Sequence, residues 1–418
     1  MSTLFAVLAA AFLVGAVLAC SDLDPAVPAA DLEGRSASAA ADLAPSDTLD
    51  LTSDGGAIAM PSRDVERLVA SDSLWAEALR IHYDALVLDG HVDTPSLMVN
   101  RGYRITERHR RDHLDLPRMA DGGLDGAFFA AYVARSYGEG QEATDRALEL
   151  IEETKRQVSE TDDAEIATSA ADVRAARARG RAAILLGLEG GHALQGSVDV
   201  LRVLAGNGIR YVTLTHTNTN AFADASTDVA RWGGLNDLGR ELVREMNRLG
   251  VLVDLSHVSD AAAFDALEAT RAPVILSHSS CRALYGHVRN APDDVLEAVA
   301  ENGGAVMINF YDTYIGEGQV DLEDVLDHVD HAVRVAGVDH VGLGSDFDGV
   351  PSLPAGLEDV TRLPWITYGL LQRGYSETAI RKILGGNTIR VLEAADHVAS
   401  RYRDLEVEPI PTRPPTDR

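Results

Sequence analysis

Short apolar segments alternate with amphipathic helical patterns along most of this chain, and this alternation limits the fold more than any other feature. Alternating strands and helices form βα units around a parallel sheet. Eight such units predict an α/β fold of the (β/α)8, TIM-like barrel type. The expected strands are Leu86–Asp93, Ala127–Val133, Ala182–Glu189, Tyr211–His216, Val251–His257, Pro273–His278, Ala305–Phe310 and His340–Asp346. The expected helices are Asp145–Val158, Val198–Gly206, Leu235–Leu249, Asp260–Ala269, Asp293–Ala300 and Leu322–Val335, followed by a helical cap over Leu363–Ala399.

Polar side chains stand where most of these strands end, which is where a barrel of this kind carries its chemistry. In the first strand His91 and Asp93 are two positions apart, so their side chains point the same way. Histidines scattered through a core would not favour the last position of successive apolar strands. The set therefore predicts a metal site, built from the strand-end residues His91, Asp93, Glu189, His216, His257, His278 and Asp346.

The number of donors indicates two metal ions rather than one. A single catalytic zinc needs three protein ligands and an open position, whereas five candidate ligands are available: His91, Asp93, Glu189, His257 and His278. Lys155 and Lys382 are the only lysines and both lie in helical patterns, which disfavours a carboxylated lysine as the bridge and leaves Glu189. Two metals about 3.5–4 Å apart would hold a hydroxide and polarise a carbonyl. Such ligands suit zinc, with manganese, cobalt and iron as alternatives.

Three further residues have candidate roles beside the metal ligands. Asp346 is the expected group for proton transfer; the alternative is a further ligand or a capping carboxylate. His216 would polarise a substrate carbonyl or stabilise an oxyanion, or it is a structural histidine at the barrel top. Arg289, in the loop after the sixth strand, could grip a carboxylate through two hydrogen bonds, or it is an ordinary surface arginine.

The charge balance and the N-terminus bear on partners and location. The chain has 418 residues and a net charge of −28, which argues against a nucleic-acid partner because phosphates require a basic surface. The apolar run Leu4–Ala19 is short for a membrane span of ~20 residues and fits a signal sequence better. The tetrad Val17-Leu18-Ala19-Cys20 resembles the lipobox of bacterial lipoproteins, in which the cysteine is lipidated. An uncleaved anchor is the alternative.

These features predict four regions of the chain. Residues 1–20 would be a lipoprotein-type signal peptide, and residues 21–60, rich in Ala, Asp, Ser and Pro, a disordered tether. Residues 61–400 would form the barrel with its C-terminal helices, and residues 401–418 an extended tail. A lipid on Cys20 would hold the barrel at the bacterial cell envelope, outside the cytoplasm.

Several motifs together resemble the membrane (renal-type) dipeptidase family, zinc peptidases of the amidohydrolase superfamily. The resemblance covers about Val65 to Ala399 in uninterrupted order. The motifs that carry it are Asp89-Gly90-His91-Val92-Asp93, Asp115-Leu116-Pro117-Arg118, Gly187-Leu188-Glu189-Gly190-Gly191-His192, Leu214-Thr215-His216, Asp254-Leu255-Ser256-His257-Val258-Ser259, Ser277-His278-Ser279-Ser280, Arg289-Asn290 and Gly344-Ser345-Asp346-Phe347-Asp348-Gly349.

The resemblance implies a role for each of these side chains. His91, Asp93 and bridging Glu189 would hold one zinc, and Glu189, His257 and His278 the other. His216 would contact the scissile carbonyl, Arg289 the free C-terminal carboxylate of the substrate, and Asp346 the amino group and the proton in transfer. The implied activity is hydrolysis of dipeptides, often with a D-residue at the second position, by a homodimeric enzyme. The alternatives are a related amidohydrolase acting on N-acyl amino acids, lactones or β-lactams, and a surface lipoprotein that binds peptides without turnover.

Overall fold

The computed structural model describes residues 59–407 of the chain. The predicted signal peptide with Cys20, nearly all of the predicted tether and the last residues of the predicted tail, 408–418, lie outside the described residues. The expectation of an extended tail from residue 401 is wrong for its first part, because residues 401–407 continue helix α15 (Asn387–Val407). Within the described range, no helix is both long enough and apolar enough to span a bilayer.

Eight parallel strands close into a barrel, as the sequence predicts. β1 pairs with both β2 and β9, and β2 pairs with β4, so the ring runs β1-β2-β4-β5-β6-β7-β8-β9 and returns to β1. A ninth strand, β3, was not predicted; it pairs with the beginning of β4 outside this ring. The strands are β1 (Leu88–Val92), β2 (Gly126–Tyr132), β3 (Ala164–Ile166), β4 (Ala182–Glu189), β5 (Ile209–Thr213), β6 (Leu252–Asp254), β7 (Ile275–Leu276), β8 (Ala305–Ile308) and β9 (Val341–Leu343).

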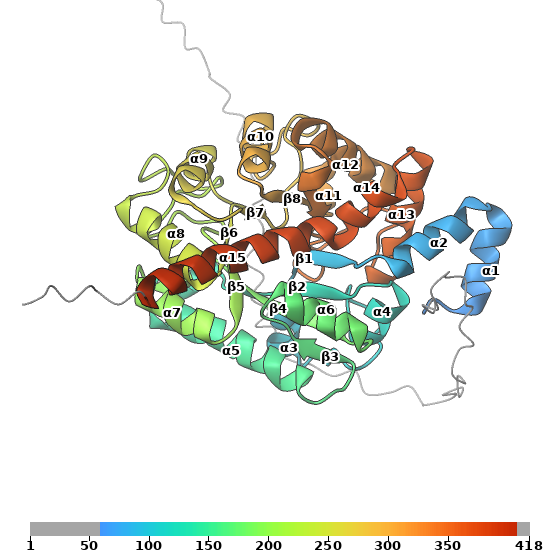
Figure 1. The fold of residues 1–418 in the computed structure, drawn as a ribbon, viewed down its shortest axis with the longest axis horizontal. Helices are drawn as coiled ribbons and strands as arrows, with labels where there is room; N and C mark the ends of the chain where they lie inside the picture. The colour runs from blue at the N-terminus through green and yellow to red at the C-terminus, as the bar shows by residue number, and fades with distance from the viewer. Residues whose placement is uncertain (1–58, 408–418) are drawn as a thin grey trace, which may run out of the picture.

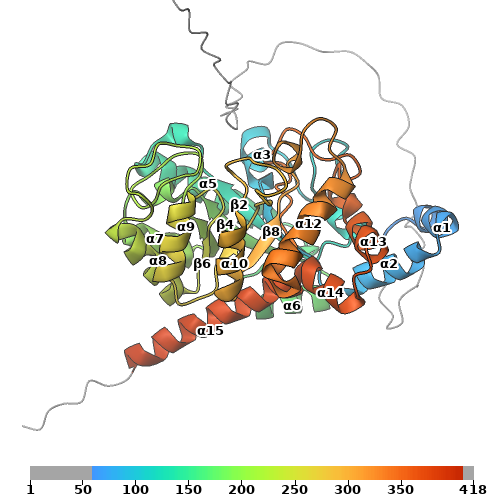
Figure 2. The ribbon, with the colours of Figure 1, turned by 90° about the horizontal axis from the view of Figure 1, so that it is seen from above.

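Helices surround the barrel (Figures 1 and 2), and all six predicted helices are present, as α5, α7, α8, α9, α10 and α12. Local signals set their ends: the side chain of Asp321 and that of Asp324 form a reciprocal capping box at the start of α12. The helices are α1 (Ser62–Ser71), α2 (Leu74–Asp84), α3 (Thr94–Arg101), α4 (Leu116–Asp121), α5 (Gln141–Val158), α6 (Ala170–Ala178), α7 (Val198–Gly206), α8 (Asp237–Leu249), α9 (Asp260–Ala269), α10 (Asp293–Glu301), α11 (Asp312–Ile315), α12 (Leu322–Ala336), α13 (Leu363–Gln372), α14 (Glu377–Arg381) and α15. Shorter helical turns are η1 (Arg135–Tyr137), η2 (Gly191–Leu194), η3 (Val338–His340), η4 (Val360–Arg362) and η5 (Lys382–Gly386).

The long C-terminal helix α15 closes the end of the barrel where the strands begin. It crosses the barrel in Figure 1. Its apolar side chains pack with residues from the first positions of the strands and from the barrel interior in one buried cluster, which includes Leu88, Phe128, Leu185, Tyr211, Ile275, Ala305, Ile389, Leu392 and Ala395. Because this end is filled by side chains, the opposite end, where the strands finish, is the one left for polar residues.

The strands finish earlier than the sequence predicts. β5 ends at Thr213, β6 at Asp254 and β9 at Leu343, so His216, His257 and Asp346 lie in the loops just beyond them. His257 and Asp346 have positive φ angles of 69° and 65°. A residue in this left-handed conformation cannot continue an extended strand. Such conformations are costly for residues other than glycine and tend to persist at functional sites.

Candidate active site

Glu189, the last residue of β4, is the centre of the polar cluster at the open end of the barrel. Four imidazoles point their Nε2 atoms at its carboxylate, which is almost fully buried. On Oε1 the distances are 3.0 Å from His257, 3.5 Å from His278 and 3.9 Å from His216. His91 approaches the other oxygen, Oε2, at 3.6 Å. The four histidines come from four different strand ends, so only the closed barrel brings them together.

Asp93 and Asp346 complete the cluster on the side of β1. Oδ2 of Asp93 lies 3.2 Å from Nε2 of His91, while its Oδ1 is buried without a hydrogen-bond partner among residues 59–407. The backbone N–H of Asp346 donates to the carbonyl of His91 at 3.0 Å. The side-chain amide of Asn309, just after β8, donates to Oδ2 of Asp346 at 2.9 Å. Asp346 is therefore held in the cluster by its neighbours on both sides.

His216 and Arg289 lie at the border of this cluster. The ring of His216 packs against the rings of His257 and Tyr132, with centroids 4.5 Å and 4.9 Å apart. Arg289 is 4% exposed, which excludes the surface-arginine alternative. Its guanidinium donates to the carbonyl of His278 at 3.1 Å, and its Nε is buried without a hydrogen-bond partner in the part of the chain that the structure describes. A buried guanidinium with spare donors can take a carboxylate.

The structure also places residues that the sequence analysis did not single out behind the imidazoles. The hydroxyl of Tyr211, inside the barrel on β5, lies 2.7 Å from Nδ1 of His91. The hydroxyl of Ser277 lies 2.8 Å from Nδ1 of His278 and donates to Asp254 at 2.6 Å. The search for polar residues at strand ends could have found Asn309 and Asp254, because each stands at or next to the end of an apolar strand. Tyr211 carried no such signal, since an aromatic residue within a strand is usually core.

The electrostatics of the cluster follow from burial and from the packing of opposite charges. Burial opposes ionisation of Glu189, but the imidazoles of His91 and His216 outweigh it and hold the pKa of Glu189 well below its usual range. Burial also opposes a charged His91, yet the carboxylates of Glu189 and Asp93 raise its pKa well above normal. Burial, with Arg289 nearby, lowers the pKa of His257 well below normal. Ionised Glu189 and neutral His257 are therefore in the forms that bind a metal, whereas His91 would release a proton on binding one.

The donor set fits divalent metal ions of the zinc type. Three overlapping groups have ligand atoms within 4.8 Å of one another: His91 with Asp93 and Glu189, His91 with His278 and Asp346, and Glu189 with His216 and His257. Nε2 of His257 and Nε2 of His278 are only 2.9 Å apart and both face Oε1 of Glu189. Oδ1 of Asp93 has no hydrogen-bond partner within the described range, and the two imidazole nitrogens lie close together beside one carboxylate oxygen. Bound cations would account for both features, because each of these atoms can donate a lone pair to a metal. His91, Asp93, Glu189, His257 and His278 would hold them.

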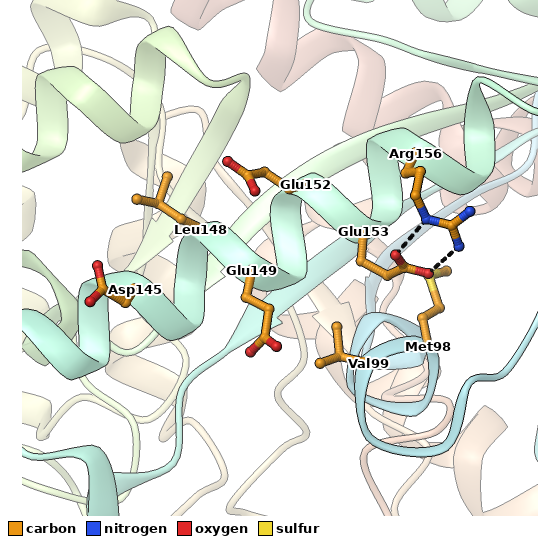
Figure 3. A pocket seen from close by; sticks show the side chains of 8 residues that line it. All are labelled: Met98, Val99, Asp145, Leu148, Glu149, Glu152, Glu153 and Arg156. Carbon is orange, nitrogen blue, oxygen red and sulfur yellow. Dashed lines mark hydrogen bonds and ion pairs between the residues drawn. The ribbon is translucent and has the colours of Figure 1, made fainter.

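A groove elsewhere on the surface has different chemistry. It lies between α5 and α3, and Figure 3 shows its acidic side chains along α5, with Arg156 paired to Glu153 at 2.7 Å. None of the strand-end residues lines it. It is lined by Met98, Val99, Asp145, Leu148, Glu149, Glu152, Glu153 and Arg156. This groove is therefore separate from the candidate active site, whose residues lie at the end of the barrel where the strands finish.

Comparison with known proteins agrees with this geometry. The family model "Membrane dipeptidase (Peptidase family M19)" matches residues 75–406. Dipeptidase tcpJ of Claviceps purpurea (strain 20.1) is 40% identical over 344 residues, covering 79% of this chain and 77% of that protein. The crystal structure of dipeptidase AC, a metallo peptidase of family M19, is 30% identical with a TM-score of 0.69, covering 74% of this chain and 98% of that one.

A second solved structure was determined with a bound ligand. It is a metallo peptidase from Rhodobacter sphaeroides liganded with a phosphinate mimic of the dipeptide L-Ala-D-Ala. It is 30% identical to this chain, with a TM-score of 0.67, and the match covers 74% of this chain and 99% of that one. The family model spans most of the barrel together with its helices and includes every strand-end residue described above. This chain therefore belongs to the membrane dipeptidase family, peptidase family M19.

Proposed function

We propose that this protein is a zinc-dependent dipeptidase in which Glu189 bridges two metal ions. The observation that carries the proposal is the convergence of four imidazoles on the buried carboxylate of Glu189, with His257 at 3.0 Å and His91, on the opposite oxygen, at 3.6 Å. Imidazoles on both oxygens of one carboxylate suit a bridge better than a single-metal site. When bound, the two ions would supply Lewis acidity towards the scissile carbonyl and a hydroxide nucleophile at neutral pH.

His216 and Asp346 have the positions that the remaining chemistry needs. Burial, together with the charge of Arg289, lowers the pKa of His216, which favours a neutral ring that can donate one hydrogen bond to a developing oxyanion. The carboxylate of Asp346 is fixed by Asn309 and by its left-handed backbone. We assign to Asp346 the transfer of a proton to the leaving amine, because a carboxylate beside the reacting centre can accept and return it.

Arg289 gives the site its preference for short substrates. Its guanidinium lies beside His278 and near Tyr314, whose ring centroid is 5.4 Å from its Cζ. A free carboxylate bound there would place the peptide bond of a dipeptide, but not that of an internal peptide segment, next to the metal ligands. The Rhodobacter sphaeroides relative binds a mimic of L-Ala-D-Ala, which supports acceptance of a D-residue at the second position.

Metal content and turnover measured on one preparation test the proposal. We expect about two zinc ions per chain, cleavage of L-Xaa-L-Xaa and L-Xaa-D-Xaa dipeptides, loss of cleavage on chelation and recovery when zinc is added back. Two zinc ions without dipeptide cleavage would redirect the same site to N-acyl amino acids, lactones or β-lactams, which belong in the same panel. Protein that binds no metal after zinc supplementation would overturn the ligand assignment.

We also propose that Cys20 carries a lipid that holds the enzyme at the bacterial cell envelope, outside the cytoplasm. The apolar run Leu4–Ala19 immediately before Cys20 supports this. Expression in a bacterium with an alkyne-tagged fatty acid tests it. The parent chain should be labelled and recovered with the membranes, whereas a Cys20→Ser variant should be unlabelled. Equal labelling of the two would contradict the assignment.

A further inference from the structure

The three imidazoles assigned to metal binding are supported differently on their far side. Nδ1 of His278 faces the hydroxyl of Ser277 at 2.8 Å, and Nδ1 of His91 faces the phenol of Tyr211 at 2.7 Å. Nδ1 of His257 is buried without a hydrogen-bond partner among residues 59–407. The group behind a ligand histidine fixes its tautomer and its ring orientation. The contact behind His91 comes from β5, inside the barrel.

Tyr211 is fixed on several sides. It is fully buried inside the barrel, where its ring packs against that of Phe128 with centroids 5.0 Å apart and lies nearly parallel to the ring of His91 at 6.1 Å. Gly187 on β4 makes room for it: a methyl carbon at Gly187 would stand 2.1 Å from Cζ of the tyrosine. Only glycine at this position allows the neighbouring strand to present a full tyrosine ring there. The packing of the ring therefore fixes the position of the Tyr211 hydroxyl relative to His91.

The direction of the hydrogen bond follows from the other nitrogen of His91. Its Nε2 faces Asp93 at 3.2 Å and Glu189 at 3.6 Å, the two carboxylates of the first metal position. A neutral imidazole carries one proton, so an Nε2 whose lone pair is free for a metal requires the proton on Nδ1. Nδ1–H must then donate to the Tyr211 oxygen. With the opposite direction, Nε2 would carry the proton and could not bind.

We propose that Tyr211 is a positioning residue for metal binding: its phenol oxygen accepts the Nδ1–H of His91 and keeps Nε2 free for the metal shared with Asp93 and Glu189, and Gly187 provides the space for its ring. This inference rests on the proposed metal site. It assigns the effect to one of the two metal positions, because Tyr211 contacts His91, whereas the other position is formed by His257 and His278.

A Tyr211→Phe variant tests this, because it keeps the ring and removes only the oxygen. Tyr103→Phe is the matched control: Tyr103 is also buried, and its hydroxyl donates to the carbonyl of Leu114 at 2.9 Å and accepts from Arg118 at 3.3 Å, neither of which is a proposed metal ligand. Zinc affinity is measured on chelator-stripped proteins by competition with a chromophoric chelator, and cobalt(II) absorption spectra report on the ligand geometry. We expect one of the two dissociation constants of Tyr211→Phe to rise about 10- to 100-fold, with an altered cobalt spectrum, while Tyr103→Phe matches the parent.

The outcomes separate this inference from the proposed function. If the parent binds two zinc ions and Tyr211→Phe binds both with the same affinities, Tyr211 has no positioning role although the metal site stands. If the parent itself binds fewer than two, the binuclear assignment fails. Should Tyr211→Phe not fold, nitrogen NMR of the zinc-loaded parent labelled in its histidines, with the His91 signal identified by its absence in His91→Asn, gives the answer. A proton on Nδ1 of His91 supports the inference, and a proton on Nε2 overturns it.

Discussion

Gly349 lies directly against the carboxylate of Asp93: a methyl carbon at Gly349 would stand 2.1 Å from Oδ2 of Asp93 and 2.6 Å from Oδ1 of Asp346. Both carboxylates belong to the proposed site, so Gly349→Ala must displace them. We expect zinc affinity to fall by at least about tenfold and kcat to fall with it. Gly206→Ala is the control, because a methyl carbon there meets nothing within 4 Å. Metal content and dipeptide turnover measure both effects; equal zinc affinity in the two variants would contradict the expectation.

Replacing Glu189, the carboxylate proposed as the bridge, should prevent the proposed site from holding two ions. Glu189→Gln keeps the size of the side chain but loses the charge that four imidazoles surround. We expect zinc content to fall from two to one or fewer per chain and dipeptide cleavage to fall by more than about 100-fold. Elemental analysis after gel filtration measures the content. Glu152→Gln on the exposed face of α5 should behave as the parent; two tightly bound zinc ions in Glu189→Gln would show that Glu189 is not the bridge.

The role assigned to Asp346 predicts a loss of rate without a loss of metal. Asp346→Asn is nearly isosteric, but an amide cannot carry a proton between the nucleophile and the leaving amine. We expect kcat to fall by about 10²- to 10⁴-fold, with zinc content unchanged. Steady-state kinetics with elemental analysis on the same sample separates the two effects. A variant that loses one zinc ion instead would make Asp346 a further ligand, which is the alternative that the sequence left open.

Arg289 should distinguish substrates by their carboxylate. Arg289→Ala removes the charged donor, and we expect kcat/KM for dipeptides to fall roughly 100-fold. This corresponds to a loss of about 3 kcal/mol in binding of the transition state. Hydrolysis of an uncharged ester or a C-terminally amidated dipeptide should change by less than about threefold. Arg289→Lys keeps the charge without the planar fork, so its dipeptide activity should lie between the two. Equal losses on charged and uncharged substrates would mean that Arg289 supports the fold of the site rather than the carboxylate.

The buried side chain of His82, on helix α2, predicts a pH dependence of stability. Its Nδ1 faces the hydroxyl of Thr367 and its Nε2 the carbonyl of Gly122, and burial lowers its pKa from 6.5 to about 4. Between these values the unfolded chain binds more protons than the folded one, so the free energy of unfolding falls as the pH decreases. We expect His82 to account for a loss of about 1 kcal/mol between pH 7 and pH 5.5.

Urea unfolding of the parent and of His82→Gln at the two pH values measures this contribution. The free energy of unfolding of the parent should fall by about 1 kcal/mol more than that of the variant between pH 7 and pH 5.5. Identical falls in the two proteins would show that His82 does not titrate as its burial requires.

The fold and the gathering of the candidate residues at one end of the barrel could be predicted because the barrel repeats one rule. Each of His91, Glu189 and His278 lies where an apolar run stops, and the barrel carries such positions to one end. The ends of the strands were less predictable: the mainly apolar segments Val251–His257 and His340–Asp346 predict strands that run to their last residues, but the backbone has already turned to positive φ at His257 and Asp346. The end of a strand depends on where its backbone hydrogen bonds with the neighbouring strands stop. A local sequence pattern contains no information about those neighbours.

The supporting contacts could not be predicted for a related reason. Tyr211 and Gly187 lie on adjacent strands, and their complementary sizes have meaning only in the register of β4 with β5. The short strand β3 escaped prediction because Ala164-Glu165-Ile166 is too brief and too polar to stand out as an apolar run. The roles of His216, Arg289 and Asp346 remain predictions, since the structure gives their positions and not their function.

Closure of the barrel through β1, which pairs with both β2 and β9, has a consequence for the timing of maturation. During synthesis His91 leaves the ribosome first and Asp346 among the last of the site residues, since chains are made from the N-terminus. Until β9 is added, β1 and β8 both present unpaired edges. The cluster around Glu189 also lacks Asp346, which follows β9 in the chain. Capture of the metal ions is therefore expected to follow completion of the chain, as the closing event of biogenesis rather than the nucleus from which folding begins.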